Sequence, residues 1–173
     1  MAPISRDVTG GGSGAMGASG WEYVTPYEGT VEKSLEALHA QVFQELYGDD
    51  DTYQDLEELW DDEEFMGEEG THSILDIDRV VHTTAAPSPN DIRDYGTLRP
   101  LAHERVLHHF GTDRPTPGRF EELVAQGRAT IGRSPDRTER LLDECRMRWT
   151  GVYVLLYTDD QPTHLGIFGF SGD

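Results

Sequence analysis

The sequence has one cysteine, one lysine and no long apolar run. The single cysteine, Cys145, excludes an internal disulfide bond, and no activating signature surrounds it, which favours a buried, inert thiol. No stretch of about 18 apolar residues is present, so no transmembrane helix is expected. The first residues also lack the apolar core of a signal peptide, and we therefore expect a cytoplasmic protein.

Basic residues are scarce as well, and their distribution is uneven. The formal net charge of −19 comes from 33 acidic and 14 basic residues, which argues against nucleic acid or an anionic membrane as a partner. Residues 1–78 contain 20 acidic and 2 basic residues, a balance of −18, whereas residues 79–173 contain 13 and 12, a balance of −1. A negative surface so concentrated would accelerate the capture of a cationic partner.

The 173 residues suit one domain with a tail. Residues 1–20 are rich in Gly, Ser and Ala and have no apolar periodicity, so they predict a disordered tail, or a remnant of an artificial linker. Residues 21–173 contain 16 aromatic residues, enough for one modest core, and are expected to form a single domain.

Apolar spacing predicts the main elements of that domain. Leu35, Leu38, Val42 and Leu46 recur every three or four residues after a potential N-cap at Thr30, which predicts a helix over 31–47. Two β-rich runs, 151–157 and 164–170, flank a short polar turn and predict a C-terminal hairpin whose Val152, Val154 and Leu156 face the helices.

Weaker patterns complete the expected fold. Pro26 places an extended segment near 21–27 at a sheet edge, and the acidic residues after Gly48 predict one further helix. We also expect a strand at 73–81 and helices at 101–110, 119–127 and 136–146. The fold class is therefore α+β, with several helices packed on a small, mostly antiparallel sheet that ends in the hairpin.

The segment from Asp49 to Glu69 holds twelve carboxylates and no Lys or Arg. Three interpretations are open: a solvated helix face, a metal site, or a surface for a basic protein. An EF-hand loop starting at Asp49 fails, because Gln54 stands where Gly is required and Trp60 where Glu is required. The residues expected to bind a partner are Asp55, Glu58, Asp61, Asp62, Glu63, Glu64, Trp60 and Phe65.

Signatures of metal binding and catalysis are missing. The sequence HERVLHH resembles a zinc-binding helix, but His103 and His108 are five residues apart and cannot share one helical face. Ser73 lacks the glycine-flanked turn of a hydrolase nucleophile, and no phosphate-binding loop is recognisable. We therefore expect no metal, no cofactor and no assignable catalytic residue.

Three segments carry a resemblance: WEYVTPYEGTVEKSLEALHAQVF, GEEGTHSILDIDRV and WTGVYVLLYTDDQPTHLGIFGFSGD. They resemble an uncharacterised family of small bacterial proteins that shares a Gly-Thr-x-Ser-Ile-Leu-Asp box and a closing hairpin. The resemblance implies a compact domain and brings no activity, cofactor or catalytic residue. It draws attention to a potential polar pocket lined by Thr71, Ser73 and Asp76, and to Ser171 and Asp173 at the end of the chain.

Two functional hypotheses follow. The leading one is an acidic protein-binding module, such as an immunity or antitoxin-type inhibitor that covers the basic active site of a toxin, for example a nuclease. The alternative is a small hydrolase or transferase with a histidine or carboxylate site near residues 71–78.

Overall fold

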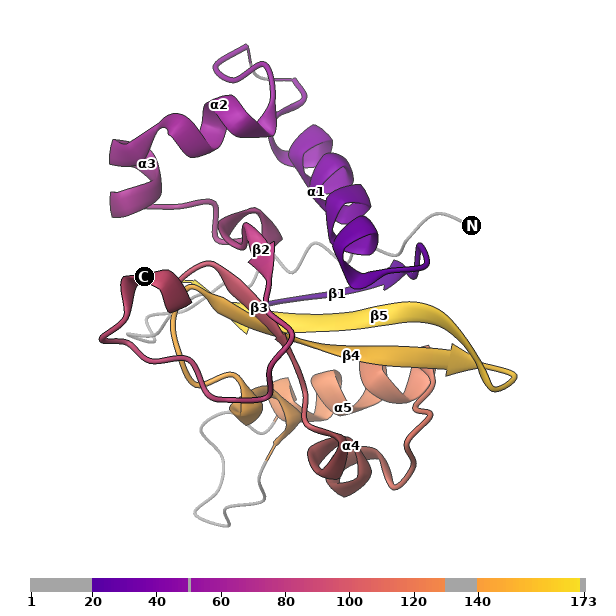
Figure 1. Cartoon of the computed structure of the whole chain (residues 1–173). Helices are drawn as coiled ribbons and strands as arrows, with labels where there is room; N and C mark the ends of the chain where they lie inside the picture. The colour runs from indigo at the N-terminus through magenta and orange to yellow at the C-terminus, as the bar shows by residue number, and fades with distance from the viewer. Residues whose placement is uncertain (1–19, 50, 130–139, 172–173) are drawn as a thin grey trace.

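The computed structural model describes residues 20–49, 51–129 and 140–171, which form a five-stranded sheet with helices on both faces (Figure 1). The strand order is β1-β5-β4-β3-β2, with antiparallel pairing of β1 with β5 and of β5 with β4, and parallel pairing of β4 with β3 and of β3 with β2. The strands are β1 (Gly20–Pro26), β2 (Arg79–Val80), β3 (Thr97–Pro100), β4 (Thr150–Thr158) and β5 (Gln161–Phe170). The expected α+β class, the mostly antiparallel sheet and the C-terminal hairpin are confirmed, and Pro26 lies on an edge strand.

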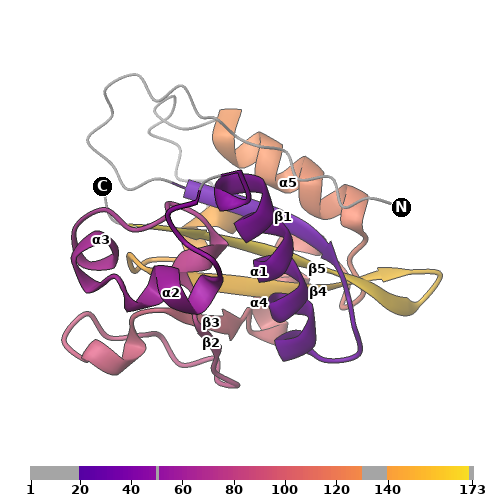
Figure 2. The ribbon, with the colours of Figure 1, turned by 90° about the horizontal axis from the view of Figure 1, so that it is seen from above.

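The helices divide into two groups, one on each face of the sheet (Figures 1 and 2). One face carries α1 (Val31–Tyr47), α2 (Leu56–Asp61), α3 (Glu63–Glu68) and the 3₁₀ turn η1 (Ile74–Asp76). The other carries α4 (His103–Phe110), α5 (Pro117–Ala129) and the 3₁₀ turn η3 (Leu141–Glu144). A further 3₁₀ turn, η2 (Ile92–Asp94), precedes β3.

Helix α1 has the predicted bounds because its start is capped and its inner face is apolar. The Thr30 side chain accepts a hydrogen bond from the Lys33 backbone N–H, which satisfies one of the free donors of the first turn. Leu35, Leu38 and Val42 are buried against the sheet, as the spacing predicts. Leu46 is 48% exposed, and Phe43 and Tyr47 pack against the core in the last turns instead.

The hairpin contributes to the cores on both faces. Leu165 and Ile167 of β5 pack in the cluster beneath α1, while Phe168 packs with Phe120 of α5 in the second cluster. Gly166 allows this approach, because a Cβ atom there would lie 2.6 Å from the Phe120 ring. Val154 and Leu156 of β4 are buried in the same second cluster, so that side of β4 faces α5 as predicted.

Several predicted elements differ in the structure. The acidic stretch forms two short helices, because Asp62 ends α2 and caps α3. The expected strand at 73–81 is the 3₁₀ turn η1 followed by the two-residue strand β2, so Asp76 is buried in η1 and Asp78 is exposed; the two do not share a strand face. Within the expected helix at 136–146, the described part contains only η3.

Two further points concern the start of the chain and a parallel strand. Residues 1–19 of the predicted tail lie outside the described residues, while Gly20 is the first residue of β1. The short parallel strand β3 had no recognisable sequence pattern and was not predicted.

Candidate functional site

The acidic segment is organised by carboxylates that cap its own helices. Asp55 accepts a hydrogen bond from the Glu58 backbone N–H at the start of α2. Asp62 accepts from the Phe65 backbone N–H at 3.0 Å and from the Tyr53 hydroxyl at 2.7 Å. These two hydrogen bonds hold the pKa of Asp62 below its usual value, and the bond from Phe65 has the larger effect. Asp62 therefore has a structural role in addition to its charge.

The aromatic residues of the segment point toward the core. The Trp60 indole Nε1–H donates to the Leu75 carbonyl at 2.7 Å, and its ring meets the His39 ring edge-on at 5.5 Å. Phe65 packs against the same core cluster, with its ring 6.3 Å from that of Tyr53. Trp60 and Phe65 are half-buried. Their side chains attach α2 and α3 to the core and leave little surface for contact with a partner.

The exposed surface of α2 and α3 is consequently made of carboxylates. Five of the predicted partner-binding residues are exposed: Asp55, Glu58, Asp61, Glu63 and Glu64. Within the described ranges, no Lys or Arg side chain forms an ion pair with an acid of the segment 51–69. Their charge is thus not neutralised by the fold itself.

His39 lies beneath this acidic surface as a neutral donor. Its Nε2–H donates to the Ile74 carbonyl at 3.3 Å, and only 7% of the residue is exposed. Burial lowers the pKa of the imidazole from its usual value, because the charged form would lose its hydration. His39 therefore links α1 to η1 as part of the core.

The predicted pocket residues form a hydrogen-bonded cluster with the end of the chain. Asp76 Oδ1 accepts from the Thr71 backbone N–H at 2.6 Å and from the Thr71 hydroxyl at 2.8 Å. Asp76 Oδ2 accepts from the Ser171 hydroxyl at 2.5 Å, and Ser171 accepts from the Trp21 indole N–H at 3.2 Å. The two short stretches singled out in the sequence thus meet in space. We name Thr71, Ser73, Asp76 and Ser171 the Asp76 cluster.

The polar atoms of the Asp76 cluster are already used inside the protein. The Ser73 hydroxyl lies 2.7 Å from the Thr71 hydroxyl and accepts from the Leu75 backbone N–H at 3.1 Å. Gly70, with φ of +68°, turns the chain into the cluster beneath the Trp149 ring. These contacts give Thr71, Ser73 and Asp76 the geometry of a structural junction, with Asp76 and Ser73 buried.

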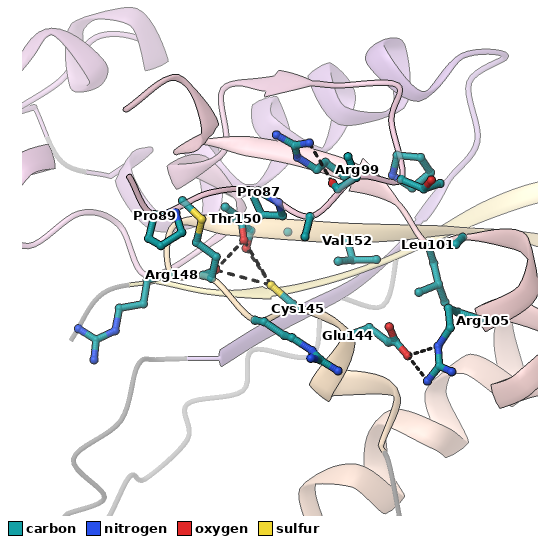
Figure 3. Close-up of a pocket in the computed structure, with 18 of the residues that line it drawn as sticks. Pro87, Pro89, Arg99, Leu101, Arg105, Glu144, Cys145, Arg148, Thr150 and Val152 are labelled. Atoms are coloured by element: carbon teal, nitrogen blue, oxygen red, sulfur yellow. Dashed lines mark hydrogen bonds and ion pairs between the residues drawn. The ribbon is translucent and has the colours of Figure 1, made fainter. Parts of the chain in front are cut away.

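A cavity of about 710 Å³ lies elsewhere, on the α4–α5 side of the sheet (Figure 3). Its walls come from the loop after β2, the end of β3, the start of α4 and the segment from Glu144 to Val152. Four arginines line it: Arg99, Arg105, Arg146 and Arg148. The sequence analysis missed this site because its residues are far apart in the sequence and match no motif.

Cys145 lines the same cavity but has no features of a nucleophile. Burial raises the pKa of its thiol, and the thiol donates to the Thr150 carbonyl at 3.4 Å. Metal ligation has no support in the described part of the chain either, where no group of three or more His, Cys, Asp or Glu side chains is placed to hold an ion.

In comparisons with known proteins, no protein-family model, no curated protein and no solved structure matches the chain. The resemblance to an uncharacterised bacterial family therefore stays an expectation based on the sequence motifs. Across the described residues, the helices are too short or too polar to span a membrane.

Proposed function

We propose that this protein is an acidic binding module whose α2–α3 surface receives a basic protein. The observation that carries the proposal is the row of exposed carboxylates on α2 and α3, which no basic side chain of the described chain neutralises. Uncompensated charges of one sign on a rigid surface speed the encounter with an oppositely charged partner.

The packing beneath the surface supports the same proposal. Trp60 is held by the Leu75 carbonyl, and Asp62 by Tyr53 and Phe65, so α2 and α3 are fixed to the core by specific contacts. A surface held in this way presents its charges in a defined arrangement, which reduces the ordering that binding would otherwise require.

The finer proposal is an immunity or antitoxin-type inhibitor, acting in the cytoplasm on a toxin with a basic active site. A nuclease is the natural example, because its substrate is a polyanion and its active site is therefore basic. The acidic helices would occupy that site in place of the nucleic acid.

The alternative, a hydrolase or transferase near residues 71–78, receives less support. Such an enzyme needs donors and acceptors that are free to contact a substrate. In the Asp76 cluster both oxygens of Asp76 and the hydroxyls of Thr71 and Ser171 are engaged with one another or with the backbone.

Charge reversal on α2 and α3 tests the proposal. The variant carries Asp61→Lys, Glu64→Lys and Glu68→Lys, which are exposed positions, and leaves the caps Asp55 and Asp62 intact. The control reverses three exposed acids on the opposite side, Asp113→Lys, Glu121→Lys and Glu122→Lys. Both variants change the net charge equally, so a difference between them reports on position.

The partner is sought first by capture from host lysate at low salt and among the products of adjacent genes. We expect the captured protein to be basic, and the α2–α3 variant to associate about tenfold or more slowly than the control. The wild-type rate should fall as ionic strength shortens the Debye length from about 30 Å at 0.01 M to about 8 Å at 0.15 M. Acidic partners, or equal rates for the two variants, would show that the surface is only solvated.

A further inference from the structure

The cavity on the α4–α5 side has a charge that contrasts with the rest of the molecule. Four arginines and two glutamates, Glu104 and Glu144, line it, in a protein whose net charge is −19. Arginines thus outnumber carboxylates along the wall of the cavity, and its volume of about 710 Å³ falls within the range of small-molecule sites, about 300–1,000 Å³.

Arg99 is the most informative of these residues. Its side chain is 10% exposed, and its guanidinium donates from Nη1 to the Ala85 carbonyl and from Nη2 to Asp94 Oδ1, each at 3.0 Å. The third nitrogen of the guanidinium, Nε, is buried, and its N–H has no hydrogen-bond partner among the described residues. Buried donors without a partner are rare in native proteins and call for an explanation, such as a ligand that supplies the acceptor.

Arg105 forms a second cationic element on the wall of the cavity. Its Nε and Nη2 both lie 2.7 Å from Glu144 Oε1, which also accepts from His109 Nε2 at 2.8 Å. Glu144 is thus occupied by two donors from α4. In Figure 3 Arg99 lies above Val152 and the Arg105–Glu144 pair lies below it, while the Arg148 guanidinium extends away from the other labelled residues.

The start of α4 adds backbone donors. Ala102, the N-cap residue, lines the cavity and makes no side-chain cap hydrogen bond. The first N–H groups of a helix without such a cap are available to an anion, which the helix dipole also favours. Other residues that line the cavity are apolar, among them Pro87, Leu101, Met147 and Val152.

From these contacts we infer that the cavity binds a small organic anion. Its anionic oxygens, of a carboxylate or a phosphate monoester, accept from Arg99 Nε–H, Arg105 and the start of α4. Its apolar body lies against Pro87, Leu101 and Val152. The site is separate from the acidic surface of α2 and α3, so this inference does not depend on the proposed protein partner.

Three naphthalene compounds with the same body test the inference: 2-naphthoate, 2-naphthyl phosphate and the neutral naphthalene-2-carboxamide. Each is titrated into ¹⁵N-labelled full-length protein. We expect saturable amide shifts over residues 99–105 and 144–152 with the anions, and about tenfold weaker binding of the amide, because charge-assisted hydrogen bonds are the stronger ones. The tighter of the two anions identifies the headgroup that the cavity prefers.

Variants localise the binding. Arg105→Gln and Ala86→Trp, the second of which fills the cavity while retaining every arginine, should each weaken the better anion about tenfold or more. Arg99→Met should also weaken binding of the better anion if the variant folds. If it does not fold, the other two variants test the inference. Arg114→Gln, at an exposed arginine outside the cavity, is the control and should bind like the wild type.

Three results would overturn the inference. They are saturable shifts with none of the three compounds, equal affinity for the amide and the anions, and wild-type affinity in both Arg105→Gln and Ala86→Trp.

Discussion

The helices on the two faces of the sheet differ in whether their acidic residues form ion pairs. On the α4–α5 side, acids and bases pair with each other: Arg105 with Glu144, Arg119 with Glu122, and Arg128 with Glu22 of β1. On the side of α2 and α3, no described acid of the segment 51–69 has a Lys or Arg partner, and two of these acids, Asp55 and Asp62, cap helix ends. Yet both sides rest on well-buried apolar clusters that share the β4–β5 hairpin.

This difference distinguishes the apolar packing that stabilises the fold from the charges that are exposed at its surface. Apolar burial fixes both sets of helices, so apart from the caps Asp55 and Asp62 the carboxylates of α2 and α3 are not needed to fix the fold. The charged residues on the other side pair with one another, and four arginines line the cavity there. Four predictions follow from the comparison, from the largest expected effect to the smallest.

Truncating one buried leucine on each face tests whether the faces form one cooperative unit. Leu156 and Leu165 are both fully buried in the hairpin, in the second and the first cluster respectively. Each change to Ala should lower the free energy of unfolding by about 2–5 kcal/mol, because it leaves a cavity. Denaturant unfolding measures the effect, and two separate transitions or a near-neutral result for Leu156→Ala would contradict the shared core.

Asp76→Asn should weaken the junction beneath the acidic side. An amide cannot accept from Thr71 on one side and from Ser171 on the other, so one buried donor loses its acceptor. The expected loss is about 1–3 kcal/mol, and Ser171→Ala, which leaves both Asp76 Oδ2 and the Trp21 indole N–H without their partner, should cost a similar amount. An unchanged midpoint for Asp76→Asn in denaturant would mean that the cluster does not contribute to stability.

Acid should selectively weaken the His39 contact. Because the folded pKa of His39 lies below its unfolded value near 6.5, the unfolded chain takes up the proton first. Stability from this residue is complete above about pH 6.5 and falls as the pH drops toward the folded pKa. The pH dependence of unfolding should flatten in His39→Gln, whereas His103→Gln at an exposed position keeps the wild-type slope.

The smallest effect concerns the exposed acids themselves. Asp61→Lys, Glu64→Lys and Glu68→Lys together should change stability by no more than about 0.5 kcal/mol, since exposed charges contribute little. Thermal unfolding at low salt is the measurement, with the Asp113, Glu121 and Glu122 reversal beside it. A loss of several kcal/mol in the α2–α3 variant alone would show that these acids are structural and would break the contrast between the faces.

Sequence patterns predicted the parts of the fold that depend on neighbouring residues. The spacing of Leu35, Leu38 and Val42 and the cap at Thr30 placed α1 correctly, and alternation placed β4 and β5. The patterns predicted β2 too long, over 73–81, and missed β3; these strands have two and four residues and depend on pairing with distant segments. They also missed the division of the acidic helix at Asp62, which one local side-chain bond decides.

The candidate sites show the same limit. The charge of α2 and α3 could be read directly from the sequence, because its residues are contiguous. The cavity could not, since Arg99 and Arg105 meet the segment 144–152 only through the packing of β3, β4 and α4. Likewise, Asp76 and Ser171 stood out separately, but their contact spans 95 residues and no local pattern specifies it.

The pairing of β1 with β5 has a consequence for how the protein is made. Gly20 lies opposite Phe170, so the first strand of the sheet has no partner until nearly the whole chain has been synthesised. During that interval the sheet does not yet cover the apolar side of α1, and such exposed apolar surface favours aggregation. The carboxylates of α2 and α3 emerge from the ribosome directly behind α1 and confer mutual repulsion on the unfinished chains. The carboxylates that we propose as a surface for a partner would thus act earlier as well, by repulsion between unfinished chains.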